Sequence, residues 1–235
     1  MQIPDSIHMP SDFAQRIHFA LRSWHNQKSD DALINLLLVK QMRMERKGAS
    51  VRMISNEILL KGIEYLRKND KDAADILQAR FLDQETAQAV GFRRNLSEDI
   101  IFQRQRAAIE QLAVVIWGEE QGLLKQRKAR IEARLEPPTY RKLFGVEQKI
   151  AQIRSLLELE PEPAMLALEG MGGLGKTSLA DALARQLAGN IHFEEIGWVS
   201  ARRHLFQFSG DIEAVNTRPD LTTAELIDSL IEQFI

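Results

Sequence analysis

Eight residues in the second half of the chain restrict its fold more than any other feature. Residues 170–177 read Gly-Met-Gly-Gly-Leu-Gly-Lys-Thr and fit the pattern G-x-x-x-x-G-K-[ST]. A short apolar run, residues 164–168, precedes them, and an amphipathic segment, residues 177–188, follows. A strand buried on both faces, a glycine-rich turn and a helix, in that order, are typical of a phosphate-binding loop in an α/β protein.

Each part of this loop has a physical role at a phosphate. Glycines allow backbone conformations that are closed to other residues and let the chain approach a ligand closely. Successive N–H groups then form an anion-binding concavity, to which the following helix adds its positive end. The Lys176 amine can reach the β- and γ-phosphates, and the Thr177 hydroxyl can bind Mg²⁺, a cation that prefers oxygen ligands. The sequence therefore predicts ATP or ADP with Mg²⁺, bound by Gly170, Met171, Gly172, Gly173, Leu174, Gly175, Lys176, Thr177 and Ser178.

A proline pair, Pro137-Pro138, divides the chain. Ahead of it, apolar residues recur at helical spacing in every periodic segment, so residues 1–136 are predicted to form an all-α domain. The predicted N-caps of three of its helices are Ser55, either Asn69 or Asp70, and Ser97. Two acidic residues follow Ser97 and favour the positive end of a helix. Residues 137–142 are the predicted linker.

Behind the linker, residues 143–235 alternate between helix and strand patterns. A helix over residues 146–159 ends at a proline-rich stretch, and residues 196–200 form a second predicted strand. Residues 222–234 are predicted as a helix capped by Thr222 or Thr223. This order predicts an α/β fold, the start of the parallel sheet of a P-loop nucleoside triphosphatase. The sheet is incomplete and is preceded by the all-α domain.

Composition excludes several other kinds of site. The 235 residues contain no cysteine, which excludes disulfides, thiolate metal sites and a catalytic thiol, and which fits a reducing cytoplasm. The N-terminus lacks the pattern of a signal peptide, and apolar runs such as residues 36–39 are too short to span a bilayer. None of the five histidines forms a close pair with metal-ligand spacing. The sequence thus predicts a cytoplasmic protein without a membrane segment and assigns no catalytic residue.

The loop and its surroundings resemble one branch of P-loop proteins, the STAND ATPases, which include the NB-ARC proteins of plant immunity and apoptosis. Residues 170–180 read GMGGLGKTSLA and match the usual family string GMGGxGKTxLA at every fixed place. Residues 193–200, FEEIGWVS, are similar to the aromatic second strand of the family. Phe144-Gly145-Val146-Glu147 stands where the family has Val-Gly-Arg-Glu, a segment that touches the adenine, so valine replaces the family's arginine.

The resemblance implies a nucleotide switch that transduces a signal and that engages a protein partner or a second copy on activation. It also implies a later strand ending in aspartate, which holds Mg²⁺ and helps to position water. No such segment follows the loop in the sequence, so we interpret the chain as the N-terminal part of a longer protein. That longer protein is expected to be an ATPase, whereas these 235 residues are expected to show negligible hydrolysis.

The same resemblance implies that residues 1–136 form an effector or adaptor domain. Within it, residues 76–113 resemble the helix-turn-helix of sigma-factor region four, with Ser97 at the start of the recognition helix. The candidate DNA contacts are Arg93, Arg94, Gln103, Arg104 and Arg106. This alternative function is a nucleotide-gated, DNA-binding transcriptional regulator. An interaction bundle with solvated arginines stays open as well, and so does a different P-loop enzyme, such as a kinase or an AAA-type ATPase.

Overall fold

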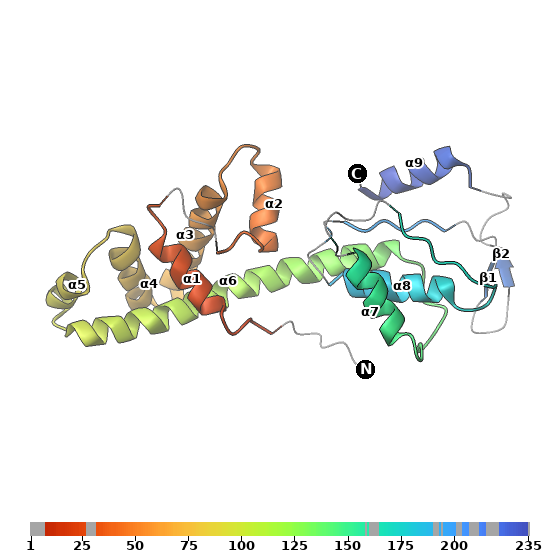
Figure 1. Cartoon of the computed structure of the whole chain (residues 1–235). Coiled ribbons are helices and arrows are strands. Elements are labelled where there is room, and N and C mark those ends of the chain that lie inside the picture. The colour runs from red at the N-terminus through yellow and green to blue at the C-terminus, as the bar shows by residue number, and fades with distance from the viewer. Residues whose placement is uncertain are drawn as a thin grey trace. The chain divides into compact units, whose positions relative to one another are not determined.

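The computed structural model describes residues 8–26, 32–157, 159, 165–189, 193, 195–200, 204–206, 212–214 and 221–234. These residues fall into two compact units, 1–124 and 125–235, which are described one at a time. The boundary between the units lies inside the longest helix, α6 (Glu98–Arg134), shown in Figure 1. The proline pair of the sequence therefore lies within the second unit.

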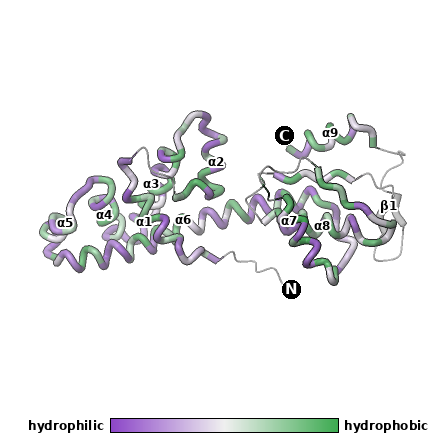
Figure 2. Tube along the Cα trace, viewed as in Figure 1, coloured by the Kyte–Doolittle hydropathy of each residue, from purple (hydrophilic) through white to green (hydrophobic). Residues whose placement is uncertain are grey.

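The described residues of the first unit form helices. Besides the first part of α6, they are α1 (Phe13–Arg22), α2 (Leu37–Glu45), α3 (Val51–Asn69), α4 (Lys71–Leu77), the π-helix η1 (Gln78–Leu82) and α5 (Ala87–Arg94). Polar and apolar residues alternate along these helices (Figure 2), and most of the buried apolar side chains meet in one core. Its fully buried members include Phe13, Ile17, Leu59, Ile63 and Leu112.

A glycine lets two helices of this core approach each other closely. A Cβ atom built at Gly62 on α3 would lie 2.7 Å from Leu112 Cδ1 and 3.2 Å from Ile116 Cγ1, both on α6. Separations under 3.0 Å are essentially never seen for real Cβ atoms. Packing therefore selects glycine at position 62, although glycine inside a helix costs about 0.5–1 kcal/mol relative to alanine.

The helix starts of the first unit test the predicted caps. Ser97 Oγ accepts a hydrogen bond from a first-turn N–H of α6 at 3.4 Å, and Asp70 Oδ1 accepts one from the first turn of α4 at 3.0 Å. These two caps are confirmed. The Ser55 cap is wrong, because Ser55 is buried within α3 and Ser50 caps that helix, with a hydrogen bond of 3.2 Å. A serine side chain is small enough for a buried helix face, so its presence alone did not mark the helix start.

A buried carboxylate on α6, that of Glu120, caps α2 from a distant part of the sequence. Its two oxygens accept hydrogen bonds from Leu37 N at 2.7 Å and Leu38 N at 3.0 Å. The first N–H groups of a helix have no partner within the helix, so this carboxylate satisfies two of them. Burial raises the pKa of Glu120, and the two hydrogen bonds oppose that effect.

We expect the stability of the first unit to depend on pH through Glu120. An acid with a raised folded-state pKa contributes stability that is fully present below its unfolded pKa, here 4.5, and is lost as the pH rises through the folded pKa. Glu120→Gln removes this titration. As the pH rises above 4.5, the unfolding free energy of the variant should therefore rise relative to that of the wild type. Urea unfolding at several pH values measures the difference, and a difference independent of pH would contradict the assignment.

The described residues of the second unit form the end of α6, three further helices and a pair of short strands. The helices are α7 (Glu147–Leu157), α8 (Lys176–Leu187) and α9 (Thr223–Phe234), and the strands are β1 (His204–Phe206) and β2 (Ile212–Ala214). Ile150 and Ile153 of α7 share a buried cluster with Leu183 and Leu187 of α8. The two strands pair antiparallel, with His204 opposite Ala214.

The predicted parallel sheet is wrong. In the described part of the chain, the only sheet is the antiparallel pair β1–β2, and residues 165–168 and 196–200 are not in strands. Residue 164, the first of the predicted strand, lies outside the described residues. Leu166 and Leu168 are partly buried against the α7–α8 cluster, so the apolar run reflected burial and not strand pairing.

Trp198, in the second predicted strand, has its backbone polar groups bound by a side chain. Trp198 N donates to Gln233 Oε1 at 2.9 Å, and Gln233 Nε2 donates to Trp198 O at 2.8 Å. Gln233 belongs to α9, so this helix lies against the segment 195–200. A primary amide presents one donor and one acceptor side by side, as a backbone peptide in a neighbouring strand does.

Candidate functional site

The loop that leads into α8 has a backbone conformation that selects glycine. The φ angles are 153° at Gly170, 81° at Gly173 and 78° at Gly175. Residues with a Cβ atom rarely adopt this region of conformational space. Gly175 directly precedes Lys176, the first residue of α8. The conformation of the loop therefore accounts for three of the four glycines in the motif.

Lys176 holds its positive charge at the loop itself. Its Nζ donates hydrogen bonds to Gly170 O and to Met171 O, each at 2.7 Å. The side chain thus bends back from the first residue of α8 toward the first two residues of the motif. This places the ammonium group beside the backbone that the motif predicts to surround the phosphates.

The loop has free donors for an anion. Among the described residues, no backbone hydrogen bond is formed by the N–H groups of residues 172–178, and the first such bond in α8 runs from Leu179 N to Gly175 O at 2.8 Å. These N–H groups lie at a helix N-terminus, where the helix dipole also favours negative charge. A phosphate therefore fits the charge and the hydrogen-bonding capacity of the loop.

The loop also has room for a ligand. Apart from the glycine itself and its chain neighbours, no heavy atom of the described residues lies within 4 Å of a Cβ built at Gly172, Gly173 or Gly175. Gly172 lacks the positive φ of its neighbours, so neither conformation nor packing accounts for glycine there. Close approach of a ligand to the backbone is the remaining use of a glycine at this position.

Thr177 and Ser178 lie beside a small pocket at the start of α8. Tyr140, Asp181 and Trp198 also line this pocket. The indole N–H of Trp198 is buried and has no hydrogen-bond partner in the part of the chain that the structure describes. The described residues include no group of three or more histidine or acidic side chains that could hold a metal ion. A Mg²⁺ ion here would therefore depend on the Thr177 hydroxyl and on the oxygens of a phosphate.

A buried aspartate attaches the predicted linker to α8. Asp181 Oδ2 accepts a hydrogen bond from the Tyr140 hydroxyl at 2.7 Å, and Arg185 donates to both Asp181 oxygens at 2.9 and 3.0 Å. Arg185 also donates to Glu136 O at 2.6 Å. Burial, followed by the hydrogen bond to Asp181, raises the pKa of Tyr140 to about 12, so the hydroxyl stays a donor at neutral pH. Asp181 lies one helical turn after Thr177, so the linker is attached next to the loop.

The sequence favours a solvated helix face for the basic run 125–134, but the structure gives three of its arginines partners within the second unit. Arg127 is 4% exposed and donates to Ala188 O at 3.0 Å and to Phe193 O. Arg130 and Arg134 form ion pairs with Glu195. Positions 127, 130 and 134 share one face of a helix, and this spacing was the signal in the sequence.

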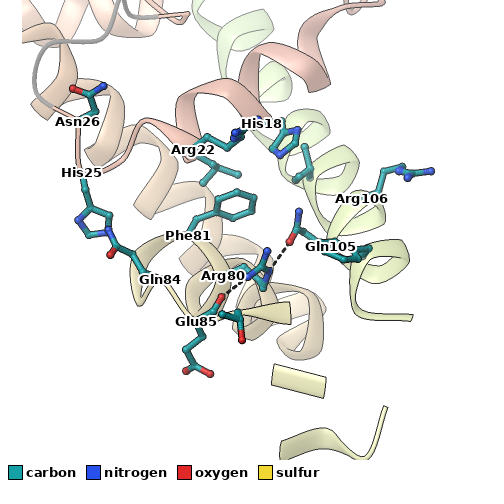
Figure 3. A pocket seen from close by; sticks show the side chains of 14 residues that line it. His18, Arg22, His25, Asn26, Arg80, Phe81, Gln84, Glu85, Gln105 and Arg106 are labelled. Atoms are coloured by element: carbon teal, nitrogen blue, oxygen red, sulfur yellow. Dashed lines mark hydrogen bonds between the residues drawn. The ribbon is translucent and has the colours of Figure 1, made fainter. Parts of the chain in front are cut away.

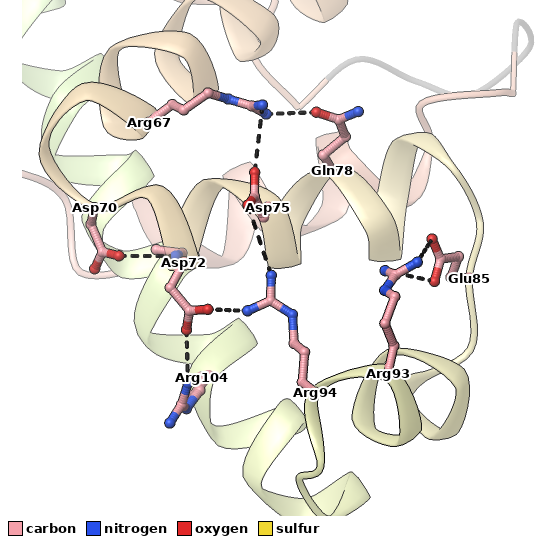
Figure 4. A network of polar contacts seen from close by, with 10 residues as sticks. Arg67, Asp70, Asp72, Asp75, Gln78, Glu85, Arg93, Arg94 and Arg104 are labelled. Carbon is pink, nitrogen blue, oxygen red and sulfur yellow. Dashed lines mark hydrogen bonds and ion pairs between the residues drawn. The ribbon is translucent and has the colours of Figure 1, made fainter.

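Figure 4 shows that three of the five predicted DNA contacts are held in ion pairs. Arg93 pairs with Glu85 at 3.0 Å, and Asp72 pairs with Arg94 and, at 2.8 Å, with Arg104. Residues 95–97 join α5 to α6, and this short connection alone does not establish a DNA-binding helix-turn-helix. Arginines in such pairs reach a phosphate only by leaving their carboxylates, which weakens the case for DNA contact at these positions.

Comparison with known proteins bears on the loop and its surroundings. Residues 146–212 match the NB-ARC domain. This NB-ARC segment begins beside α7 and includes the whole loop, α8 and residues 195–200. The chain is also similar to a probable disease resistance protein of Arabidopsis thaliana, with 24% identity over 149 residues. That similarity covers 63% of this chain and only 16% of the Arabidopsis protein, and no solved structure matches.

The NB-ARC segment supports the resemblance to P-loop ATPases of the NB-ARC type at the level of the family. All nine predicted nucleotide contacts, residues 170–178, lie inside it. These comparisons do not show a helix-turn-helix. No helix in the described part of the chain is both long enough and apolar enough to cross a bilayer.

Proposed function

We propose that the NB-ARC segment is the nucleotide-binding part of a STAND-type signalling switch. ATP or ADP with Mg²⁺ would bind at residues 170–178. Nucleotide exchange or hydrolysis in the whole protein would then change how residues 1–136, as an effector or adaptor domain, engage a protein partner or a second copy. The proposed location is the cytoplasm, which the absence of cysteine favours. The main support is the Lys176 amine beside a loop of unpaired N–H groups at the start of α8.

The chemistry of the loop residues divides the binding among them. The N–H groups of residues 172–178 would hold phosphate oxygens, with the positive end of α8 behind them. Lys176 Nζ would exchange its contacts with Gly170 O and Met171 O for the β- and γ-phosphate oxygens. The Thr177 hydroxyl would be a ligand of Mg²⁺. Bound ATP supplies the γ-phosphoryl group that hydrolysis would release.

We expect these 235 residues to release phosphate from ATP no faster than their Lys176→Ala variant. The reason is that no apolar run ending in aspartate follows the loop, so no side chain is provided to complete the Mg²⁺ shell and position water. A coupled phosphate-release assay compares the two proteins at matched concentration. Steady turnover that Lys176→Ala abolishes would show that the chain completes the catalytic site with other residues.

A DNA-binding regulator is the second candidate function. The short connection between α5 and α6 favours it, together with Arg106, which is exposed and has no ion pair among the described residues. Binding to duplex DNA should then weaken with salt, with a log–log slope of about −0.9 for each phosphate neutralised. Arg106→Ala should weaken binding or relax its sequence preference. Fluorescence anisotropy of the whole chain measures both effects, and no binding at about 50 mM salt would favour an interaction bundle.

A further inference from the structure

The first unit contains an open cavity of about 910 Å³. Figure 3 shows side chains from α1, from η1 and the turn after it, and from α6 around this cavity. Its apolar lining comes from Leu21, Phe81, Phe102 and Ile109. Small-molecule sites commonly measure about 300–1,000 Å³ and combine apolar walls with a few polar groups. The size and the apolar walls of this cavity fit a small ligand.

The charged groups around the cavity are mostly positive or can become so. They are Arg22, Arg80, Arg106, His18 and His25, against a single carboxylate among the described lining residues, that of Glu85. Arg93, which does not line the cavity, pairs with that carboxylate at 3.0 Å. The cavity therefore carries an excess of positive charge that its own lining does not neutralise.

None of these three arginines has an acidic partner among the described residues. The guanidinium groups of Arg22 on α1 and Arg106 on α6 form neither an ion pair nor a hydrogen bond there, whereas Arg80 bonds to neutral groups. The arginines of the neighbouring ion-pair network behave differently, since Arg67, Arg94 and Arg104 all pair with aspartates. The arginines of that network are thus neutralised by carboxylates, whereas among the described residues the three arginines that line the cavity are not.

Arg80 is held in place at the cavity wall. Its Nε donates to Gln105 Oε1 at 2.9 Å, and its Nη1 donates to Glu85 O (Figure 3). The guanidinium carbon lies 5.7 Å from the centre of the Phe102 ring. A guanidinium fixed by such contacts contributes positive potential without a further loss of side-chain entropy when a ligand binds.

The backbone beside the cavity is unusual in two places. Arg80 and Phe81 lie in η1, a π-helix, and Gln84 has a φ of 57° although it is not glycine. π-helical turns and left-handed residues of this kind are rare and occur often at functional sites. Burial and the nearby Arg22 charge lower the pKa of His18, which agrees with a positive potential in the cavity.

We propose that this cavity binds a small organic anion, in which an oxyanion group, phosphate or carboxylate, is joined to a flat apolar body. Arg22, whose charge acts on His18, binds the oxyanion by charge-assisted hydrogen bonds, which are the strong ones in proteins, and Arg80 and Arg106 add positive potential. The apolar body packs on Phe81 and Phe102. All of its lining residues belong to the first unit, so this proposal can be tested independently of the proposed nucleotide switch.

The test uses two probes, phenyl phosphate and benzoate, and the whole chain carrying Lys176→Ala. That background removes the lysine of the loop at residues 170–178, so phosphate binding there does not obscure the result. The readout is the His18 ring proton signal in NMR spectra, assigned by its loss in His18→Asn. We expect a saturable shift of this signal and a rise in the pKa of His18, because a bound anion favours the protonated ring. The tighter of the two probes identifies the anionic group.

The variants decide whether the arginines bind the probe. Arg22→Ala should raise Kd about tenfold, the loss of one charge-assisted contact, and Arg106→Ala should raise it less, because it removes positive potential alone. Arg104→Ala is the matched control, because it removes the same charge from the same helix at a residue that does not line the cavity. Circular dichroism checks that each variant stays folded. Absence of a saturable His18 shift with both probes, or an unchanged Kd in both cavity variants, would overturn the proposal.

Discussion

Replacing Lys176 by alanine is expected to remove most of the nucleotide affinity of the chain. The ammonium group lies 2.7 Å from two carbonyls of the loop, which places it within reach of the predicted phosphate position. A hydrogen bond to a charged group contributes about 1.5–3 kcal/mol, so the Kd for ADP with Mg²⁺ should rise about 10- to 100-fold. Isothermal titration calorimetry of the wild type and the variant measures this change.

Two further variants make that experiment specific. Lys149→Ala removes an exposed lysine of α7 in the same unit, and it should leave the Kd unchanged. Thr177→Ala should remove the Mg²⁺-dependent part of the affinity and keep the part that is measured without the metal. Thermal unfolding shows whether Lys176→Ala changes the stability of the protein in addition to removing the positive charge. Equal nucleotide binding by the wild type and by a folded Lys176→Ala protein would contradict the assignment of the nucleotide site to residues 170–178.

The second large effect is expected in the core of the first unit. Leu112 is fully buried on α6, so Leu112→Ala should lower the unfolding free energy of this unit by about 2–5 kcal/mol. The matched control is Val114→Ala on the same helix, where the side chain is 61% exposed and the change should stay within about 0.5 kcal/mol. Urea unfolding followed by circular dichroism gives both values.

Gly62 makes this prediction sharper, since its missing Cβ would meet Leu112 Cδ1. Gly62→Ala alone should destabilise the unit by about 1–3 kcal/mol through overpacking. Leu112→Ala removes the Cδ1 atom with which the new Cβ would clash. Gly62→Ala should therefore cost less stability in the Leu112→Ala background, although Ile116 Cγ1 stays at 3.2 Å. The double variant should be more stable than the sum of the single effects predicts by about 1 kcal/mol. Strict additivity would show that α3 and α6 do not pack at this point.

Local chemistry explains which parts of the molecule could be predicted from the sequence. Gly173 and Gly175 mark a turn with positive φ, and α8 starts at Lys176, one residue before the predicted position. Thr222 is confirmed as the cap of α9: its hydroxyl accepts from Glu225 N at 3.3 Å, and the Glu225 carboxylate accepts from Thr222 N at 2.9 Å. Each of these features depends on residues a few positions apart, which a sequence displays directly.

Features that depend on partners far apart in the sequence could not be predicted from it. Leu166 and Leu168 pack against the cluster formed by α7 and α8, and no property of the apolar run itself decides whether another strand pairs with it. Tyr140 and Asp181, 41 positions apart, gave no sign of their hydrogen bond. The arginine at position 94 looked available to DNA because its partner, Asp72, lies 22 positions earlier.

The hydrogen bond from Trp198 N to the Gln233 amide makes this backbone N–H a reporter of local opening. While α9 stays in place, the N–H of Trp198 is hydrogen-bonded and protected from exchange with solvent deuterons. Exchange at that single amide therefore measures how often the end of α9 detaches, on a scale separate from global unfolding. Gln233→Ala would raise the exchange rate at Trp198 while leaving the amides inside α7 unaffected. The two hydrogen bonds of the Gln233 amide also block the pairing of another strand at Trp198. Each opening event therefore exposes a backbone site at which another strand can pair.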